Sequence, residues 1–131
     1  FNVNSIFFNY IVIMTEYNPN ASSMSTNSLV DFLRNPITGD IQEVPGISKN
    51  NAQILSYGDN EYTQIKNTFQ LIGVCLTLKH TKDGELINCK DHCNLIKKYL
   101  TNKGIKSNKD TITLALVEKL NTMFPGLYNY D

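Results

Sequence analysis

Apolar residues recur along much of the chain at the three- and four-residue spacing of helices. The clearest case is residues 85–102, where leucine, isoleucine and cysteine alternate with lysines that take the other side. Gly104 follows this block as a C-terminal stop signal. Residues 110–124 show a second apolar stripe, with Asp110 as the predicted cap and Pro125-Gly126 as the stop. Both blocks are therefore predicted to be helices.

Three shorter helices are predicted before them. The first runs from a cap at Asn27 or Ser28 to a stop at Pro36, and the second runs from Ser48 to about residue 57. The third covers about residues 63–78. Its run "LIGVCLTL" is also compatible with a strand, but no partner strands are evident and helix is preferred. The predicted fold class is all-α, a compact bundle of about five short helices over residues 28–131.

Residues 1–27 are predicted to lie outside this core. The first 13 are apolar and aromatic but lack the basic start and small-residue cleavage site of a signal peptide, and they are too short to span a bilayer. Met14 is a candidate initiator, which would make these residues an upstream readthrough. An extra strand and a hydrophobic anchor are the alternatives. Residues 15–27 have the composition of a flexible polar linker.

Charge is unevenly distributed although the chain is neutral overall. Twelve lysines and arginines balance twelve acidic residues, which argues against a simple polycation that coats nucleic acid. Between Lys79 and Lys109, however, eight lysines face three acids, a local excess of +5. Such an asymmetry can guide an anionic partner, although a solvated lysine face is the commoner explanation.

The cysteines do not indicate a disulfide framework. There are three, Cys75, Cys89 and Cys93, as expected for reduced thiols in the nucleus or cytoplasm. The segment "CKDHC" also contains His92, with Cys75 and His80 nearby. Cys89 and Cys93 share one helix face and could hold a metal, but they also lie on the buried stripe, which favours packing. No phosphate-binding loop or nucleophile motif is present. We therefore expect no enzyme activity, catalytic residue, metal or cofactor.

The C-terminal segment "FPGLYNYD" follows the last predicted helix. Its aromatic residues, Tyr128 and Tyr130 among them, can fold back onto the core, which is the preferred interpretation. They can instead anchor the segment in a partner protein.

The stretch "VPGISKNNA", Val44 to Ala52, joins a tight turn to the start of a helix. Gly46 permits the turn and a close approach, Ile47 would fill the core below it, Ser48 would cap the helix and Lys49 would add charge. Backbone N–H groups at a helix start, together with the helix dipole, suit an anion such as phosphate. The sequence therefore predicts either a phosphate-binding turn or a plain helix corner here, in a hairpin motif near residues 44–57.

This pattern resembles the helix-hairpin-helix motif through Val44, Gly46, Ile47, Ala52 and Leu55. Ser48 stands where that motif usually has a second glycine. Read with "FQLIGVCLTLK" and residues 92–124, the order of elements is similar to that of the barrier-to-autointegration factor family, over about residues 36–124. The loops at 58–68 and 80–91 are longer here than in the family.

The resemblance implies a small helical nuclear or cytoplasmic protein that binds double-stranded DNA without sequence preference, forms a homodimer and engages a protein partner. By position, the DNA-contacting residues would be Gly46, Ile47, Ser48 and Lys49, and the dimer surface would fall within residues 69–79. The alternative is a protein-interaction or scaffold domain of the same fold that does not bind DNA. The neutral charge and the nearby Asp40 and Glu43 favour that alternative.

Overall fold

The computed structural model describes residues 16–22, 24–79 and 87–128. These contain five α-helices, two short 3-10 helices and no strand, which confirms the predicted all-α bundle. The 3-10 helices are η1 (Pro19–Ala21) and η2 (Ile41–Glu43). The α-helices are α2 (Thr26–Arg34), α3 (Lys49–Ser56), α4 (Thr68–Thr77), α5 (Cys89–Lys103) and α6 (Lys109–Met123).

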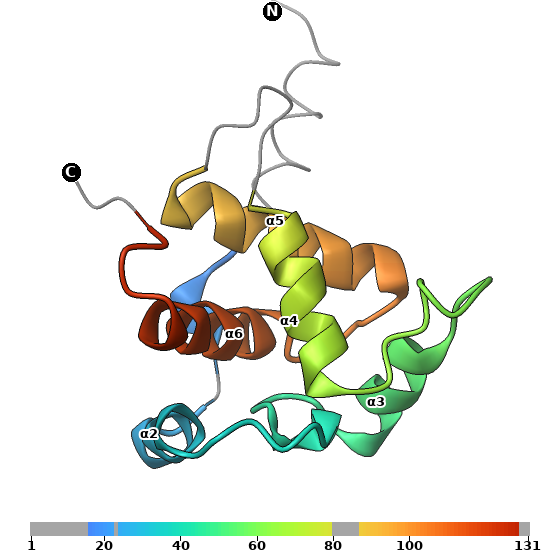
Figure 1. Ribbon diagram of the computed structural model, residues 1–131, viewed down its shortest axis with the longest axis horizontal. Helices are drawn as coiled ribbons and strands as arrows, with labels where there is room; N and C mark the ends of the chain where they lie inside the picture. Colours follow the sequence, from blue (N-terminus) through green and yellow to red (C-terminus); the bar gives the residue numbers. More distant parts are fainter. Residues whose placement is uncertain (1–15, 23, 80–86, 129–131) are drawn as a thin grey trace, which may run out of the picture.

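Helix α6 is the centre of the bundle. It packs against α5, α2, α4 and η1, and Figure 1 shows α5 above it and α2 below it. Most of its residues are buried, including Ile112, Leu116 and Leu120, which are fully inaccessible. A helix that buries several faces must be enclosed by neighbours, which explains why this one is surrounded.

Side-chain caps set most helix starts, and they correct several predicted boundaries. Ser25, not Asn27 or Ser28, caps α2, because its hydroxyl accepts a hydrogen bond from the N–H of Ser28. Helix α4 begins at Thr68 rather than near residue 63. A reciprocal pair of hydrogen bonds between Asn67 and Gln70 fixes that start.

The last two helices also begin differently from the prediction. Asn88 caps α5 at Cys89, whereas the predicted start at Glu85 lies outside the described residues. Asp110 does not cap α6. The residue at the cap position is Asn108, which has a left-handed backbone and makes no capping hydrogen bond through its side chain. The predicted end of α5 is confirmed by Gly104, with φ of 102°.

Asp110 instead fastens residues 16–18 to the bundle. It forms an ion pair with Lys97 (3.1 Å) and accepts a hydrogen bond from the N–H of Asn18 (2.8 Å). Lys97 also donates to the carbonyl of Glu16, and the N–H of Tyr17 donates to Asn94. This part of the expected linker is therefore hydrogen-bonded to α5 and α6, whereas the first 15 residues lie outside the described ones.

Several lysines of the basic segment are used inside the fold. Lys79 and Lys97 are buried, and Lys103 donates to the carbonyls of Tyr57 (2.6 Å) and Thr63 (2.7 Å). Lys90, Lys98 and Lys106 remain exposed, and Lys82 lies outside the described residues. Among the described residues, the excess of +5 therefore overstates the exposed positive charge.

Glu43 joins η2 to the loop before it and to the start of α4. Its carboxylate accepts hydrogen bonds from the N–H groups of Thr38 (3.0 Å) and Gly39 (3.0 Å) and from the hydroxyl of Thr68 (2.5 Å). Burial raises the pKa of Glu43, but these hydrogen bonds outweigh it, so the pKa lies below its ordinary value.

Glu43→Gln should destabilise the protein by about 2 kcal/mol at neutral pH, because the new amide donor would face existing donors. The lowered pKa means that Glu43 contributes stability above its unfolded pKa, and that this contribution fades as pH falls through the folded value. Urea unfolding at several pH values should show the difference between wild type and variant shrinking in acid. Glu61→Gln, at an exposed carboxylate, should change little. A difference that stays constant with pH would contradict this role.

Candidate nucleic-acid interface

Residues Val44 to Ile47 form a tight turn just before α3. The N–H of Ile47 donates to the carbonyl of Val44 (3.0 Å), and Gly46 has φ of 93°. Proline followed by a glycine with positive φ is the signature of a type II turn. The element before the turn is the three-residue η2 rather than a full helix, so a helix-hairpin-helix arrangement is not confirmed.

Gly46 is packed closely against the start of α6. A Cβ atom at this position would lie 2.8 Å from the Cγ1 of Ile112 and 3.2 Å from the Cγ2 of Thr111. At 2.8 Å a neighbouring atom would have to shift, and 3.2 Å is tighter than most contacts of a Cβ atom. The glycine is therefore required by the turn and by α6, whether or not a ligand approaches.

Asn51 holds the turn against the loop between α5 and α6. Its side-chain amide donates to the carbonyls of Gly46 (3.1 Å) and Ser107 (3.3 Å), and the residue is only 1% exposed. We call this pair of hydrogen bonds the Asn51 clamp. It holds the segment that contains the exposed Lys106 and Ser107 beside the first turn of α3.

Four backbone N–H groups around the start of α3 make no hydrogen bond within the described part of the chain. They belong to Gly46, Ser48, Lys49 and Asn50. The hydroxyl of Ser48 accepts the N–H of Asn51, which accounts for the next donor in the helix. Ser48, Lys49 and Asn50 are exposed residues, and their N–H groups lie at the positive end of the helix dipole.

An acidic groove lies on the other side of the turn. A groove of about 830 Å³ lies between α2 and the turn. Its described lining includes Asp31, Asp40 and Glu43 but no lysine or arginine, and it reaches Pro45 and Gly46. Ser48, Lys49 and Asn50 are not part of this lining. An anion would therefore be favoured at the α3 side of the turn and repelled at the groove side.

The structure keeps the four predicted contact residues together but gives them different roles. Gly46 and Ile47 serve the fold: the Ile47 side chain is buried and its N–H is used within the turn. Ser48 and Lys49 lie at the exposed helix start. Asn50 and Asn51 were not predicted from the sequence, and Lys106 was predicted only as part of the basic segment. Asn50 could have been predicted, because it lies in the first helical turn after the predicted cap at Ser48. The hydrogen bond from Asn51 to Ser107 could not, because it joins residues 56 positions apart and has no local sequence signal.

The cysteine and histidine residues of α5 do not form an exposed catalytic group. His92 is fully buried, its Nε2–H donates to the carbonyl of Cys75 (2.7 Å), and its Nδ1 accepts from the hydroxyl of Tyr128 (2.6 Å). This assigns the tautomer, because a carbonyl can only accept. Burial lowers the pKa of His92. Both ring nitrogens are thus occupied, and the C-terminal segment is folded back through Tyr128; Tyr130 lies outside the described residues.

Within the described ranges, no group of three or more histidine, cysteine, aspartate or glutamate residues is placed to hold a metal ion. None of the helices in the same ranges has the length and apolar character required to cross a bilayer. No family model matches the chain, and neither a curated protein nor a solved structure gives a significant match.

Proposed function

We propose that the protein binds double-stranded DNA without sequence preference, through phosphate contacts at the first turn of α3. The observation that carries this proposal is the row of N–H donors at the exposed residues Ser48, Lys49 and Asn50, which make no hydrogen bond within residues 16–22, 24–79 and 87–128. Such donors recognise phosphate oxygens of any sequence. Lys49 would add charge at the same helix start, and the Asn51 clamp holds the residue after Lys106 against α3.

The resemblance to the barrier-to-autointegration factor family adds a homodimer and a nuclear or cytoplasmic setting to this proposal. Helix α4 offers a surface for such a dimer: Phe69 is 59% exposed, and a Cβ at Gly73 would meet no atom within 4 Å. A large exposed aromatic ring beside a glycine gives a neighbouring helix room to approach. Two copies joined there would present two turns and could bridge two duplexes.

Binding should follow the salt dependence of counterion release. We expect the logarithm of the association constant for a random duplex to fall linearly with the logarithm of salt between about 50 and about 200 mM. Fluorescence anisotropy with labelled duplex DNA measures this slope. Lys49→Gln should reduce the slope by about one, because a single phosphate contact is lost.

Comparing Lys49→Pro with Lys49→Gln separates the contribution of the backbone N–H from that of the charge. Both variants remove the charge, but only proline also removes the N–H. Proline is well tolerated at the first position of a helix, and Ser48 already has the extended backbone that a following proline requires, with ψ of 173°. The variant removes an N–H that has no acceptor in the fold, so helix content should persist. Binding should nevertheless fall by about tenfold beyond Lys49→Gln, because a phosphate hydrogen bond is also lost.

Lys90→Gln is the matched charge control. Lys90 is exposed near the start of α5, about 20 Å along that helix from its C-terminal end, where Gly104 lies near Ile54 of α3. It should leave the salt slope nearly unchanged. The proposal is contradicted if wild type does not bind at low salt, or if Lys49→Gln, Lys49→Pro and Lys90→Gln are equivalent.

A protein-interaction domain is the second candidate function. The loop after α3 exposes two tyrosines, Tyr57 and Tyr62, the second of which is 86% exposed, and Phe69 is exposed on α4. Aromatic residues are enriched at protein interfaces. Partners that survive nuclease treatment of a pull-down, together with an absence of direct DNA binding, would favour this function over the first.

A further inference from the structure

The C-terminal segment, residues 124–128, is anchored in the core by its last residue. Residues 122–126 are exposed, whereas Tyr128 is only 3% exposed. Within the segment, the N–H of Leu127 donates to the carbonyl of Phe124 (3.0 Å) and closes a turn. The chain thus leaves α6 along the surface and returns to the core at Tyr128, near the start of α5 (Figure 1). A change that frees this one residue would release the segment and leave α6 in place.

His92 of α5 holds Tyr128 in the core. The tyrosine hydroxyl donates to Nδ1 of the imidazole (2.6 Å), and the two ring centroids are 5.5 Å apart. The other ring nitrogen donates to the carbonyl of Cys75 on α4 (2.7 Å). Both hydrogen bonds require the neutral imidazole, because only its Nδ1 has a lone pair for the tyrosine. A proton on Nδ1 would turn this acceptor into a donor, and the hydroxyl could no longer donate to it.

Lys79 makes a proton on His92 more costly still. The lysine is 1% exposed, and its Nζ has no hydrogen-bond partner among the described residues. Nζ lies 4.6 Å from the centre of the Tyr128 ring, so a charged imidazole and this ammonium group would contact the same buried side chain. Like charges repel strongly where little water screens them. Burial and the charge of Lys79 lower the pKa of His92, and burial also lowers the pKa of Lys79.

Other titratable groups supply no negative charge to offset this repulsion. Among the described residues, Lys79 is the only charged side chain that acts on His92 electrostatically. Glu118 of α6 acts on thiols of α5 instead, and the charged neighbours in sequence, Lys90 and Asp91, are exposed. Burial raises the pKa of the three thiols on α4 and α5, which therefore stay neutral: Cys75, Cys89 and Cys93.

We propose that His92 and Tyr128 form a proton-sensitive latch that releases the C-terminal segment in acid. At neutral pH the imidazole is neutral and holds Tyr128 in the core. When Nδ1 takes a proton from solvent, Tyr128 leaves the core together with residues 124–127, and α6 stays folded. The latch is separate from the DNA interface proposed above and does not depend on it.

The direction of the pH dependence follows from the pKa of His92. Its folded value lies below the ordinary value of 6.5, so the unfolded or released imidazole binds a proton more readily than the latched one. The stability that His92 contributes is therefore fully present above the ordinary value and is lost as pH falls through the folded value. The segment is closed at neutral pH and opens in mild acid.

Nuclear magnetic resonance of the full, ¹⁵N-labelled chain tests the latch. At neutral pH the amides of Leu127 and Tyr128 should be as rigid as those of α6. Between about pH 6.5 and about pH 4.5 they should become flexible in the same step in which the His92 ring nitrogens report a proton, while α6 stays ordered. The latch is refuted if the segment stays rigid once His92 is charged, if α6 loses order in the same step, or if His92 stays neutral until the whole chain unfolds.

Two variants should move the opening in opposite directions. Tyr128→Phe keeps the ring but removes the donor, so the segment should be flexible already at neutral pH. Lys79→Met removes the like charge, so the segment should open about one pH unit lower than in wild type. Tyr62→Phe and Lys98→Met, both at exposed positions, are the matched controls and should open as wild type does.

Either variant can overturn the latch. It is wrong if Tyr128→Phe remains rigid at neutral pH, or if Lys79→Met opens at the same pH as Lys98→Met. Circular dichroism checks that each variant folds. Tyr128→Phe and the wild-type titration decide the question if Lys79→Met does not fold.

Discussion

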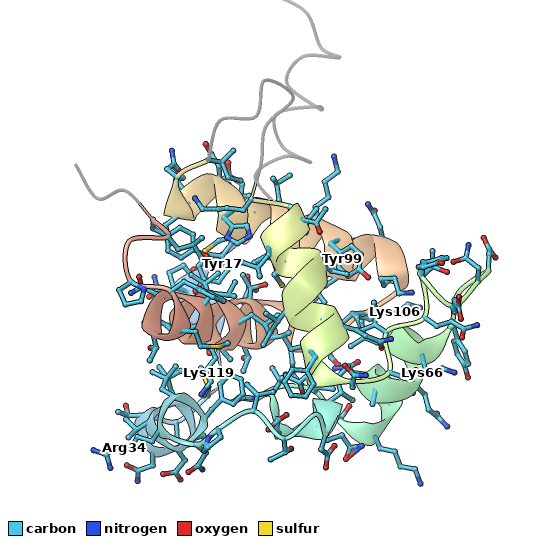
Figure 2. The ribbon with its side chains drawn as sticks, in the orientation of Figure 1. Tyr17, Arg34, Lys66, Tyr99, Lys106 and Lys119 are labelled. Carbon is cyan, nitrogen blue, oxygen red and sulfur yellow. The ribbon has the colours of Figure 1, made fainter. Side chains whose placement is uncertain are left out.

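Replacing Lys119 with methionine should lower the free energy of unfolding by about 3 kcal/mol. Lys119 reaches from α6 to the end of α2 and is only 4% exposed. Its ammonium group donates to three carbonyls, those of Phe32 (2.8 Å), Leu33 (3.1 Å) and Asn35 (2.7 Å). Figure 2 shows it between the two helices.

The expected loss of stability in Lys119→Met comes from the carbonyl groups that would be left without a hydrogen-bond donor. The last carbonyls of a helix have no partner within the helix, and here one lysine satisfies those at the end of α2. Methionine keeps much of the apolar stem but leaves buried acceptors without donors, and an unsatisfied acceptor costs more than the net value of its hydrogen bond. The contact of Nζ with the Phe32 ring, 5.3 Å from its centre, is lost as well.

Urea unfolding measures this prediction, and Lys98→Met is its control. Lys98 is exposed on α5, so the same substitution there should change stability by no more than about 0.5 kcal/mol. Hydrogen exchange adds a local readout, because α2 packs on α6 and its amides should lose protection first. Equal stability of the two variants would show that the cost of burying the ammonium group cancels its hydrogen bonds.

The helices were predictable from the sequence because their signals are local. Apolar periodicity located five segments, and Gly104 and Pro36 marked ends that depend only on neighbouring residues. The errors are also local in origin. Several residues near each helix start can serve as caps, and the choice of Ser25 or Asn108 depends on how the chain enters the helix.

The roles of the lysines were not predictable in this way. A count of charges treats every lysine as exposed, but Lys119 binds carbonyls more than 80 residues away, and Lys103 binds carbonyls at least 40 residues away. Long side chains can bury their stems and satisfy their heads at such distant groups. The count of charges along the sequence therefore overstated the exposed basic surface. The position of the Lys106 segment next to α3 depends on the hydrogen bond from Asn51 to Ser107 and could not be predicted.

In the candidate site, too, features set by neighbouring residues were predictable and contacts with distant residues were not. The Pro45-Gly46 turn and the cap by Ser48 follow from local chemistry, and the structure shows both. The close contact of Gly46 with Ile112 joins residues 66 positions apart and could not be predicted. It changes how the site must be tested, because a glycine needed by the fold is a poor probe of a ligand.

Gly46→Ala should destabilise the protein by about 3 kcal/mol and should do so without any ligand. The left-handed backbone at φ of 93° costs a residue with a Cβ about 1 to 2 kcal/mol. The new atom would also lie 2.8 Å from Ile112 and 3.3 Å from its backbone nitrogen, which cannot move without disturbing the start of α6. Overpacking of this kind adds about 1 to 3 kcal/mol.

Gly104→Ala separates these two contributions. Gly104 has a similar φ of 102°, but a Cβ there would meet only Ile54, at an ordinary 3.6 Å. Its loss in urea unfolding should therefore be about 1 to 2 kcal/mol, and the excess at Gly46 measures the contact with α6. Should the two variants be equally stable, the turn must move away from α6 at little cost. In that case a substitution of Gly46 would report on phosphate binding, and it could be used together with Lys49→Pro to test the proposed DNA interface.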